Sequence, residues 1–265
     1  MRRLSILVLS ATAFFCQLQL CTAQVAPPNE AGISMGHIHL QVADLEAHKK
    51  LWVGVLGGQE MHAGPLYLVR FPGIFVIIGQ PRTPPSDGSD GSTVHHVGFA
   101  VKNLADIKAK LTAANIAFSP ENARMAIFPD KVLVEFTEDT SLKVPIAFHH
   151  IHIASVDQEK LRSWYVKTFG GTAGTRGNFL GAMFPGGEVD FRKAQDPQAP
   201  TKGRSLDHIG FEVHGLEAFC KKLQADGMNF DMSYRDVPQI GLKIAFILDP
   251  EGTRIELTEG LAGRE

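Results

Sequence analysis

Histidine stands at the head of a short β-branched and aromatic segment four times in this sequence. The four segments are 35–40, 95–99, 148–153 and 207–211. Imidazole nitrogen binds zinc, iron, manganese and nickel, and imidazole is also a common proton carrier in catalysis. A chain that repeats histidine at the start of four similar segments is predicted to assemble a site from them.

The bulk composition is that of a globular protein. The 265 residues are 44% hydrophobic and 20% charged, with a formal net charge of −2 and a pI near 6.6. This balance lacks the basic field that nucleic-acid binding requires, so nucleic acid is not an expected partner. We expect a small-molecule substrate, and the sequence leaves a homo-oligomer open.

Residues 1–23 are predicted to be a secretory signal peptide. Two arginines, at positions 2 and 3, precede an apolar run over 4–20, and the small residues of 21–23 offer a cleavage site before Gln24. A permanent membrane anchor is less favoured because the run is short and contains serine and glutamine. The mature protein is therefore expected to be secreted or periplasmic, free of the membrane, and left with Cys220 as its one cysteine.

The remaining sequence is an internal duplication. An offset of 113 residues (150 − 37) places His37 on His150 and, without a gap, aligns Phe-Pro-Gly at 71–73 with Phe-Pro-Gly at 184–186. An offset of 112 places His96 on His208. The predicted domains are a first half at 34–138, with modules 34–80 and 94–138, and a second half at 147–260, with modules 147–193 and 206–260.

Each module is predicted to have the element order β-α-β-β-β. The first strands are expected at 37–42, 96–101, 150–154 and 208–213, where apolar residues alternate or run together. The helices are expected at 44–56, 103–114, 157–169 and 215–226. Asp44, Asn103 and Asp157 are capping residues at three of the helix starts.

Alternation along the strands predicts which side chains share a face. His150 points away from the helix because its neighbour Ile151 must pack on it. The last strand of a module places a carboxylate on the same face as the histidine, except that Ile77 takes this position in the first module. Two imidazoles with one or two carboxylates suit a divalent iron, manganese, zinc or nickel ion. The predicted ligand sets are His37, His96 and Glu135 in the first half, and His150, His208 and Glu256 in the second, with Asp190 as a fourth ligand.

Further histidines lie beside these ligands. His39 and His152 follow two residues after a ligand on the same face, where they could act as general acid or base or contact substrate. The alternative is that they are buried wall residues. His95 and His149 precede a ligand and face the opposite way, so we expect them to be structural.

The residues that carry the metal prediction resemble the vicinal-oxygen-chelate superfamily, which includes glyoxalase I, methylmalonyl-CoA epimerase, fosfomycin-resistance and bleomycin-binding proteins, and type I extradiol dioxygenases. The resemblance rests on His-x-x-x-x-Val at 37–42, 96–101 and 208–213, and on Asp-Pro-Glu-Gly at 249–252 leading into Arg-Ile-Glu-Leu at 254–257. It covers almost all of the mature chain. It implies an α+β fold of four βαβββ modules paired into two cup-shaped halves, with a metal ion in a cup.

Four modules in one chain are most similar to the extradiol dioxygenases, where the metal lies in the second half. This sequence departs from the dioxygenase pattern, because Phe246 stands where the family carries a catalytic tyrosine and 235–245 contains no histidine. The resemblance therefore keeps the metal site and weakens ring cleavage.

The favoured function is that of an exported metal-dependent enzyme, a lyase or isomerase in which the ion binds two neighbouring oxygens of a small substrate during proton transfer. An extradiol dioxygenase that uses Fe(II) is the first alternative. A non-catalytic protein that sequesters a small molecule, as bleomycin-binding relatives do, is the second, and an exported metal-binding scaffold is the third. Tyr234 and Arg235, in a long loop of the fourth module, are expected to contact substrate. A periplasmic address argues against a glutathione-dependent glyoxalase.

Overall fold

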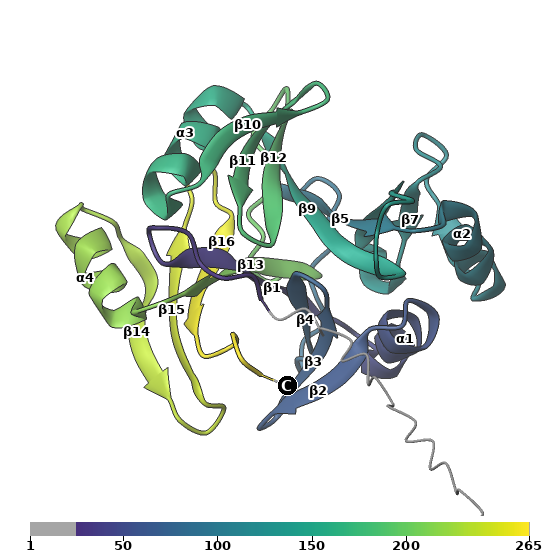
Figure 1. The fold of residues 1–265 in the computed structure, drawn as a ribbon, viewed down its shortest axis with the longest axis horizontal. Coiled ribbons are helices and arrows are strands. Elements are labelled where there is room, and N and C mark those ends of the chain that lie inside the picture. Colours follow the sequence, from purple (N-terminus) through teal and green to yellow (C-terminus); the bar gives the residue numbers. More distant parts are fainter. Residues whose placement is uncertain (1–24, 265) are drawn as a thin grey trace, which may run out of the picture.

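The computed structural model describes residues 25–264 and contains sixteen strands in two sheets, with helices packed around them (Figure 1). Modules one and two hold β1 (Ile33–Gln41), β2 (Gln59–Ala63), β3 (Leu66–Phe71), β4 (Ile74–Gly79), β5 (Val94–Val101), β6 (Ala117–Phe118), β7 (Met125–Ile127) and β8 (Leu133–Glu138). Modules three and four hold β9 (Ile146–Ser155), β10 (Thr172–Arg176), β11 (Phe179–Phe184), β12 (Gly187–Lys193), β13 (Leu206–Val213), β14 (Phe230–Val237), β15 (Leu242–Leu248) and β16 (Arg254–Glu259). The predicted α+β class and the fourfold βαβββ order are confirmed.

The four module helices form where the sequence predicts them. They are α1 (Leu45–Lys49), which continues as the π-helix η1 (Lys50–Val55), α2 (Leu104–Ala113), α3 (Gln158–Phe169) and α4 (Leu216–Ala225); a short 3₁₀ turn, η2, spans Pro129–Lys131. The side chains of Asp44, Asn103 and Asp157 each accept a hydrogen bond from the backbone N–H three residues later. These caps satisfy amides that the first helical turn leaves unpaired.

The pairing of modules differs from the expected pairing within each half. One sheet has the strand order β14-β15-β16-β13-β1-β4-β3-β2, and the other β10-β11-β12-β9-β5-β8-β7-β6. Module one therefore shares a sheet with module four, and module two with module three. We call the concave histidine-bearing faces the 1–4 cup and the 2–3 cup. The expectation that a cup forms from modules one and two, or from three and four, is wrong.

Two long loops and one short linker produce this crossed pairing. The linker after β8 is short, and it returns the chain as β9 directly beside β5, antiparallel to it. The long loops 80–93 and 194–205 carry the chain from one sheet to the other and back. They run side by side, joined by backbone hydrogen bonds that include Ser86 N–H to Gly203 O and Thr93 N–H to Ala199 O, both at 2.9 Å.

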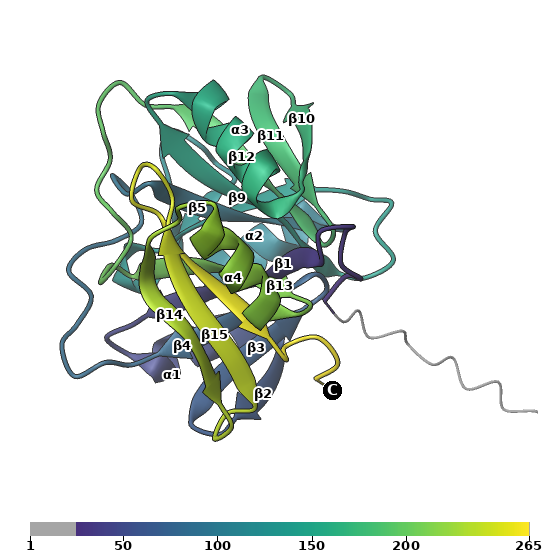
Figure 2. The same cartoon turned by 90° about the vertical axis from the view of Figure 1, so that its left-hand side faces the viewer.

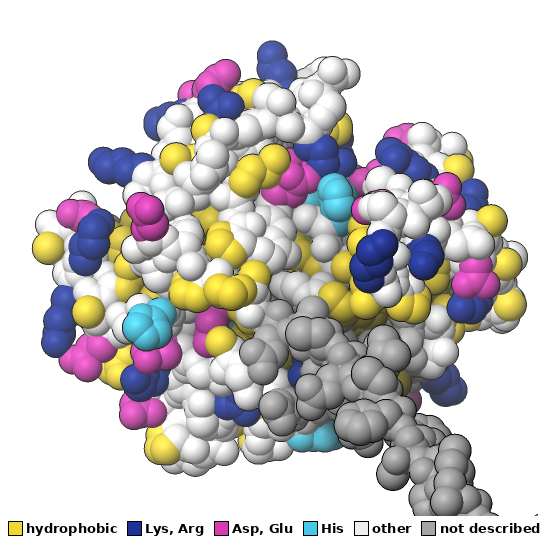
Figure 3. Space-filling model, in the orientation of Figure 1, with side chains coloured by type: hydrophobic (Ala, Val, Ile, Leu, Met, Phe, Trp, Pro, Cys, Tyr) yellow, Lys and Arg dark blue, Asp and Glu magenta, His cyan; other side chains and the backbone are white. Residues whose placement is uncertain are grey.

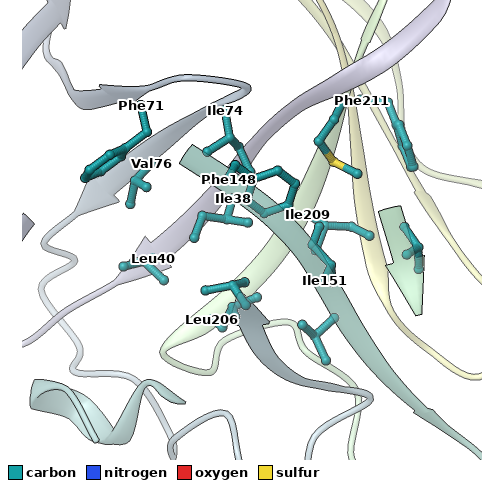
Figure 4. Packing of buried hydrophobic residues seen from close by; sticks show 14 of the residues in the cluster. Ile38, Leu40, Phe71, Ile74, Val76, Phe148, Ile151, Leu206, Ile209 and Phe211 are labelled. Carbon is teal, nitrogen blue, oxygen red and sulfur yellow. The ribbon is translucent and has the colours of Figure 1, made fainter. Parts of the chain in front are cut away.

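The hydrophobic core lies on the faces opposite the histidines. Ile38, Ile151 and Ile209, each one residue after a ligand histidine, are fully buried in one cluster that takes in both sheets (Figure 4). The helices cover the rest of this apolar surface at the outside of the molecule (Figure 2). The period-two alternation therefore places the apolar set in the core and the histidine set in the cups.

The surface carries no large field of one sign on the face shown in Figure 3, where Lys and Arg alternate with Asp and Glu. Within residues 25–264, no helix is long and apolar enough to span a membrane. The predicted signal peptide at 1–23 lies outside the described residues.

Candidate metal sites in two cups

The 1–4 cup brings together His37 from β1, His208 from β13 and Glu256 from β16. The Nε2 atoms of both histidines lie 2.9 Å from the same oxygen of Glu256, Oε2. All three side chains are buried, and their ligand atoms lie within 4.8 Å of one another. This is a two-histidine, one-carboxylate set of the kind that binds divalent transition metals.

The 2–3 cup brings together His96 from β5, Glu135 from β8 and His150 from β9. His96 Nε2 lies 3.2 Å from His150 Nε2 and 3.6 Å from Glu135 Oε2, and His150 Nε2 lies 3.4 Å from the same oxygen. A triangle with these edges has a centre about 2 Å from each corner, which is the length of a metal–nitrogen or metal–oxygen bond. The residues present therefore fit a divalent ion. His152 from β9 adds Nδ1 at 3.2 Å from His96 Nε2.

These sets correct the predicted grouping. His37 lies with His208 and Glu256, whereas His150 lies with His96 and Glu135, because the sheets join modules across the two halves. The seven predicted ligands all reach a cup face, but each set mixes residues from both halves of the sequence.

Further polar contacts fix the carboxylates and imidazoles. Asn122 Nδ2 donates to Glu135 Oε1 at 3.1 Å and Arg124 lies 3.2 Å from the same oxygen, which leaves Oε2 directed at the histidines. His208 Nδ1 lies 2.6 Å from Asp207 Oδ1, and Arg254 donates to that oxygen at 3.0 Å. A carboxylate behind a histidine fixes the tautomer that leaves Nε2 free for a metal.

One glycine in each cup makes room for a ligand ring. A Cβ atom on Gly98 would lie 2.0 Å from Cε1 of His150, and a Cβ atom on Gly210 would lie 2.0 Å from Cε1 of His37. Both distances are far below van der Waals contact, so the cross-strand residue beside each first-strand histidine has to be glycine.

Burial keeps the imidazoles of the 2–3 cup neutral. It lowers the pKa of His150 to about 3 and of His152 to about 2, and it lowers the pKa of His96 as well. Burial alone would raise the pKa of Glu135, but hydrogen bonds with His150 and His96 hold it far below its usual range. The cup therefore presents neutral nitrogens and an ionised carboxylate, the protonation state that metal binding needs.

We predict different pH dependences for metal binding in the two cups. Burial opposes the charged form of His208, but Asp207 and Glu256 outweigh it and raise its pKa above 6.5. An ion entering the 1–4 cup must displace that proton, so its affinity should fall as pH drops through the raised pKa. Affinity in the 2–3 cup should stay nearly constant between about pH 5 and 8. Zinc titrations of His150→Ala and His208→Ala at several pH values, one cup intact in each, measure this; equal slopes would contradict it.

The walls of the two cups differ in polarity. In the 1–4 cup, Ala63, Leu68, Phe75 and Ile77 are buried in a second apolar cluster. The offset of 113 residues matches them to a polar and small set in the 2–3 cup, which comprises Arg176, Gly181, Glu188 and Asp190.

The C-terminal segment packs against the apolar wall of the 1–4 cup. Leu261 belongs to the same cluster and has no exposed surface. Glu212 on β13 accepts from the backbone N–H groups of residues 260, 261 and 262, and Arg70 donates to the carbonyl of Arg264. Figure 1 shows this end of the chain between β15 and β3. The 1–4 cup is therefore occupied by its own chain next to the ligands.

The remaining predicted residues fall into two groups. His39 faces the 1–4 cup, its ring 4.5 Å from that of His208, and His152 faces the 2–3 cup. Tyr234 and Arg235 lie on the edge strand β14 and not in a loop. Tyr234 packs against the main core cluster and Arg235 is exposed, so the structure brings neither to a ligand set.

Sequence reasoning missed Arg176 and Phe179, which come from β10 and β11 of module three. Arg176 Nε donates to Asp190 and lies 2.9 Å from Glu188, and the ring of Phe179 lies 4.4 Å from that of His152. Asp190 is thus paired with an arginine. Within residues 25–264, three buried polar atoms of this cup have no hydrogen-bond partner: His152 Nε2, Arg176 Nη2 and Asp190 Oδ1. The offset to Ala63 was the signal that could have singled out Arg176.

A separate apolar cavity of about 1020 Å³ lies between η1 and α2. Its lining includes Val55, Ile107 and Ile146 and none of the ligand residues. It offers no cluster of groups that could hold a metal, so we place the chemistry in the cups.

Comparisons with known proteins agree with this architecture. The family model described as Glyoxalase/Bleomycin resistance protein/Dioxygenase superfamily matches residues 147–257. Glyoxalase I from Zea mays has a TM-score of 0.63 at 14% sequence identity, covering 86% of this chain and 92% of the maize chain. A Bacillus subtilis subsp. subtilis str. 168 protein described as a "putative dioxygenase" has a TM-score of 0.64 at 15% identity, covering 91% and 88%. At these identities the likeness shows the fold. No curated protein sequence matches significantly.

Proposed function

Starting from a chain whose residues 147–257 belong to the glyoxalase/bleomycin resistance protein/dioxygenase superfamily, we propose that the protein is a metal-dependent enzyme that acts on a small molecule with two neighbouring oxygens. The observation that carries the proposal is the 2–3 cup. There, three ligand atoms spaced for one ion lie beside unpaired polar groups, whereas the corresponding wall of the 1–4 cup is apolar and packed.

His96, His150 and Glu135 are proposed to hold the ion. A bound divalent ion would act as a Lewis acid toward the substrate oxygens. Arg176 Nη2, which has no partner within residues 25–264, is placed to donate a hydrogen bond to a substrate oxygen. Asp190 holds the guanidinium in this orientation through its hydrogen bond with Nε.

His152 is proposed to move the proton. Its Nε2 is buried and unpaired, and Phe179 packs against its ring. Burial lowers the pKa of His152 to about 2 in the free protein, so the ring starts uncharged and able to accept a proton. Negative charge that develops on a substrate next to it would raise that pKa, which couples protonation of His152 to the reaction.

We predict that His152→Gln keeps the metal and loses the reaction. The assay is hydrogen–deuterium exchange of the carbon-bound protons of hydroxyacetone in D₂O, followed by NMR, with protein loaded separately with Zn²⁺, Mn²⁺, Ni²⁺ and Fe²⁺. The exchange rate should fall by about 10²- to 10⁴-fold, the usual contribution of a general acid or base. The exposed residue His62 provides a matched control, His62→Gln, which should change neither metal content nor rate. Undiminished exchange in His152→Gln would exclude this residue as the proton carrier.

A ring-cleaving dioxygenase is the second candidate, and the 1–4 cup favours it. Its two histidines and one carboxylate resemble the facial triad of Fe(II) oxygenases, and Ile77 leaves the fourth protein position without a ligand. Phe246, 5.1 Å from the ring of His208, lacks the hydroxyl of the family's tyrosine. Oxygen uptake with catechol by the Fe²⁺-loaded protein would support this candidate. Binding of either probe without turnover would instead favour sequestration.

We also propose that the protein is exported. The support is the arginine pair, the apolar run over 4–20 and the small residues before Gln24. We predict that expression of the full chain in a Gram-negative host yields periplasmic protein whose first residue, by intact-mass measurement, is Gln24. An unprocessed N-terminus in the cytosolic fraction would contradict export.

A further inference from the structure

The residue immediately before each ligand histidine contacts that histidine from behind in three of the four modules. In the 2–3 cup, His95 Nδ1 lies 2.8 Å from His96 Nδ1, and His149 Nδ1 lies 2.9 Å from His150 Nδ1. The two ring pairs are nearly perpendicular, at 79° and 88°, with ring centroids 5.1 Å apart in both. The same arrangement thus occurs twice, on strands β5 and β9.

The 1–4 cup uses different residues at the same positions. Asp207 precedes His208 and its carboxylate lies 2.6 Å from Nδ1. Gly36 precedes His37, and His37 Nδ1 has no partner within residues 25–264. An imidazole therefore takes the place of a carboxylate in one module and of an unpaired nitrogen in another.

The contact at His95 implies a definite tautomer for His96. His95 Nε2 lies 3.3 Å from Asp90 Oδ1, and a carboxylate accepts hydrogen bonds, so the proton of a neutral His95 belongs on Nε2. His95 Nδ1 is then an acceptor, and the hydrogen bond between the two rings requires the proton of His96 on Nδ1. His96 Nε2 is left with its lone pair directed at the ligand triangle.

We propose that His95 and His149 are positioning residues, which hold His96 and His150 in the tautomer that binds an ion through Nε2. His149 can act on His150 in the same way, with Glu188 Oε1 at 3.7 Å behind it. This inference rests on the proposed function of the 2–3 cup. It reverses the expectation that these two histidines are only structural.

A neutral imidazole is a weaker acceptor than a carboxylate, so it should raise the basicity of the ligand ring less. The 2–3 cup would therefore hold its ion less tightly than a cup backed by a carboxylate. His95→Asp, which copies Asp207 of the other cup, is expected to bind Zn²⁺ at least as tightly as the wild type. His95→Phe, which keeps a ring but removes the acceptor, is expected to bind about 10- to 100-fold more weakly.

The test combines a tautomer measurement with a metal titration. Two-bond ¹H–¹⁵N correlation spectra of the metal-free protein assign the tautomer of His96, and isothermal titration with Zn²⁺ in a His208→Ala background measures the 2–3 cup alone. The wild type should show His96 protonated on Nδ1, His95→Phe should lose this signature, and His95→Asp should restore it. His62→Phe, an exposed control on β2, should change neither measurement.

Two outcomes would overturn the inference: His96 protonated on Nε2 in the wild type, or His95→Phe with unchanged tautomer and unchanged Zn²⁺ affinity. The first needs no variant, so a misfolded His95→Phe leaves the test intact. Absence of Zn²⁺ binding in the wild-type cup, with His96 still protonated on Nδ1, would instead overturn the proposed function and support the tautomer assignment.

Discussion

His150→Ala and His96→Ala should each remove the same single ion, and the double variant should remove no more. Both nitrogens belong to one triangle with Glu135, and loss of either corner leaves two ligands for an ion that needs at least three from the protein. His208→Ala should leave that ion in place, because His208 lies in the other cup. Metal content after dialysis against Zn²⁺, by mass spectrometry on folded protein, measures all four variants.

This experiment separates the observed pairing of modules from the pairing within sequence halves. If His150 and His208 shared an ion, their single variants would lose the same equivalent and the double variant would lose nothing further. The structure predicts the opposite: the losses of His150 and His208 are independent, and those of His150 and His96 are not. Wild-type protein without any bound ion would contradict the metal-dependent function itself.

The sequence predicts the module and its facing well because both are local properties. The capping residues and the alternation around Ile151 and Ile209 fix helix starts and strand faces over a few residues. All seven predicted ligands reach a cup face for this reason. The predicted strand starts were late, since β1 and β9 begin four residues before their ligand histidines. Main-chain pairing with the neighbouring strand extends them beyond the histidine.

The pairing of modules could not be read in the same way. β1 could have paired antiparallel with β5 or with β13, because both begin with a histidine and continue with the same alternation. The observed registers, His39 beside His208 and His96 beside His152, satisfy the period-two pattern no better than the alternative would. Loop paths and hydrogen bonds between loops distant in sequence decide between them, and these are non-local.

The difference in cup walls was present in the sequence but had no meaning without the third dimension. Ala63 against Arg176 and Ile77 against Asp190 are visible once the offset of 113 residues is known. That Leu261 fills the apolar wall depends on the C-terminal turn held by Glu212, which joins residues 48 or more positions apart. The choice of the 2–3 cup for chemistry therefore comes from packing.

Gly98→Ala should disable the 2–3 cup without removing any ligand. The new Cβ would lie 2.0 Å from Cε1 of His150, and the nearest atoms all belong to that ring, so the imidazole has to move. His150 is fully buried, and overpacking of this kind costs about 1–3 kcal/mol of folding free energy. We expect the ion of this cup to be lost and exchange on hydroxyacetone to fall to the level of His150→Ala.

Two glycine substitutions serve as controls. Gly210→Ala creates the same 2.0 Å contact with His37 and should destabilise the fold by a similar amount, yet leave the ion of the 2–3 cup bound. Gly54→Ala lies in η1 with nothing within 4 Å of the new Cβ, and should be neutral or stabilise by up to about 1 kcal/mol. Chemical denaturation gives the free energies, and metal analysis gives the occupancy. A Gly98→Ala protein that keeps its ion would mean that the ring of His150 can move and still bind, which would remove the steric basis for placing it as a ligand. Equal loss of that ion in Gly98→Ala and Gly210→Ala would point to general destabilisation, so the selectivity between these two variants is what ties the close approach at Gly98 to metal binding.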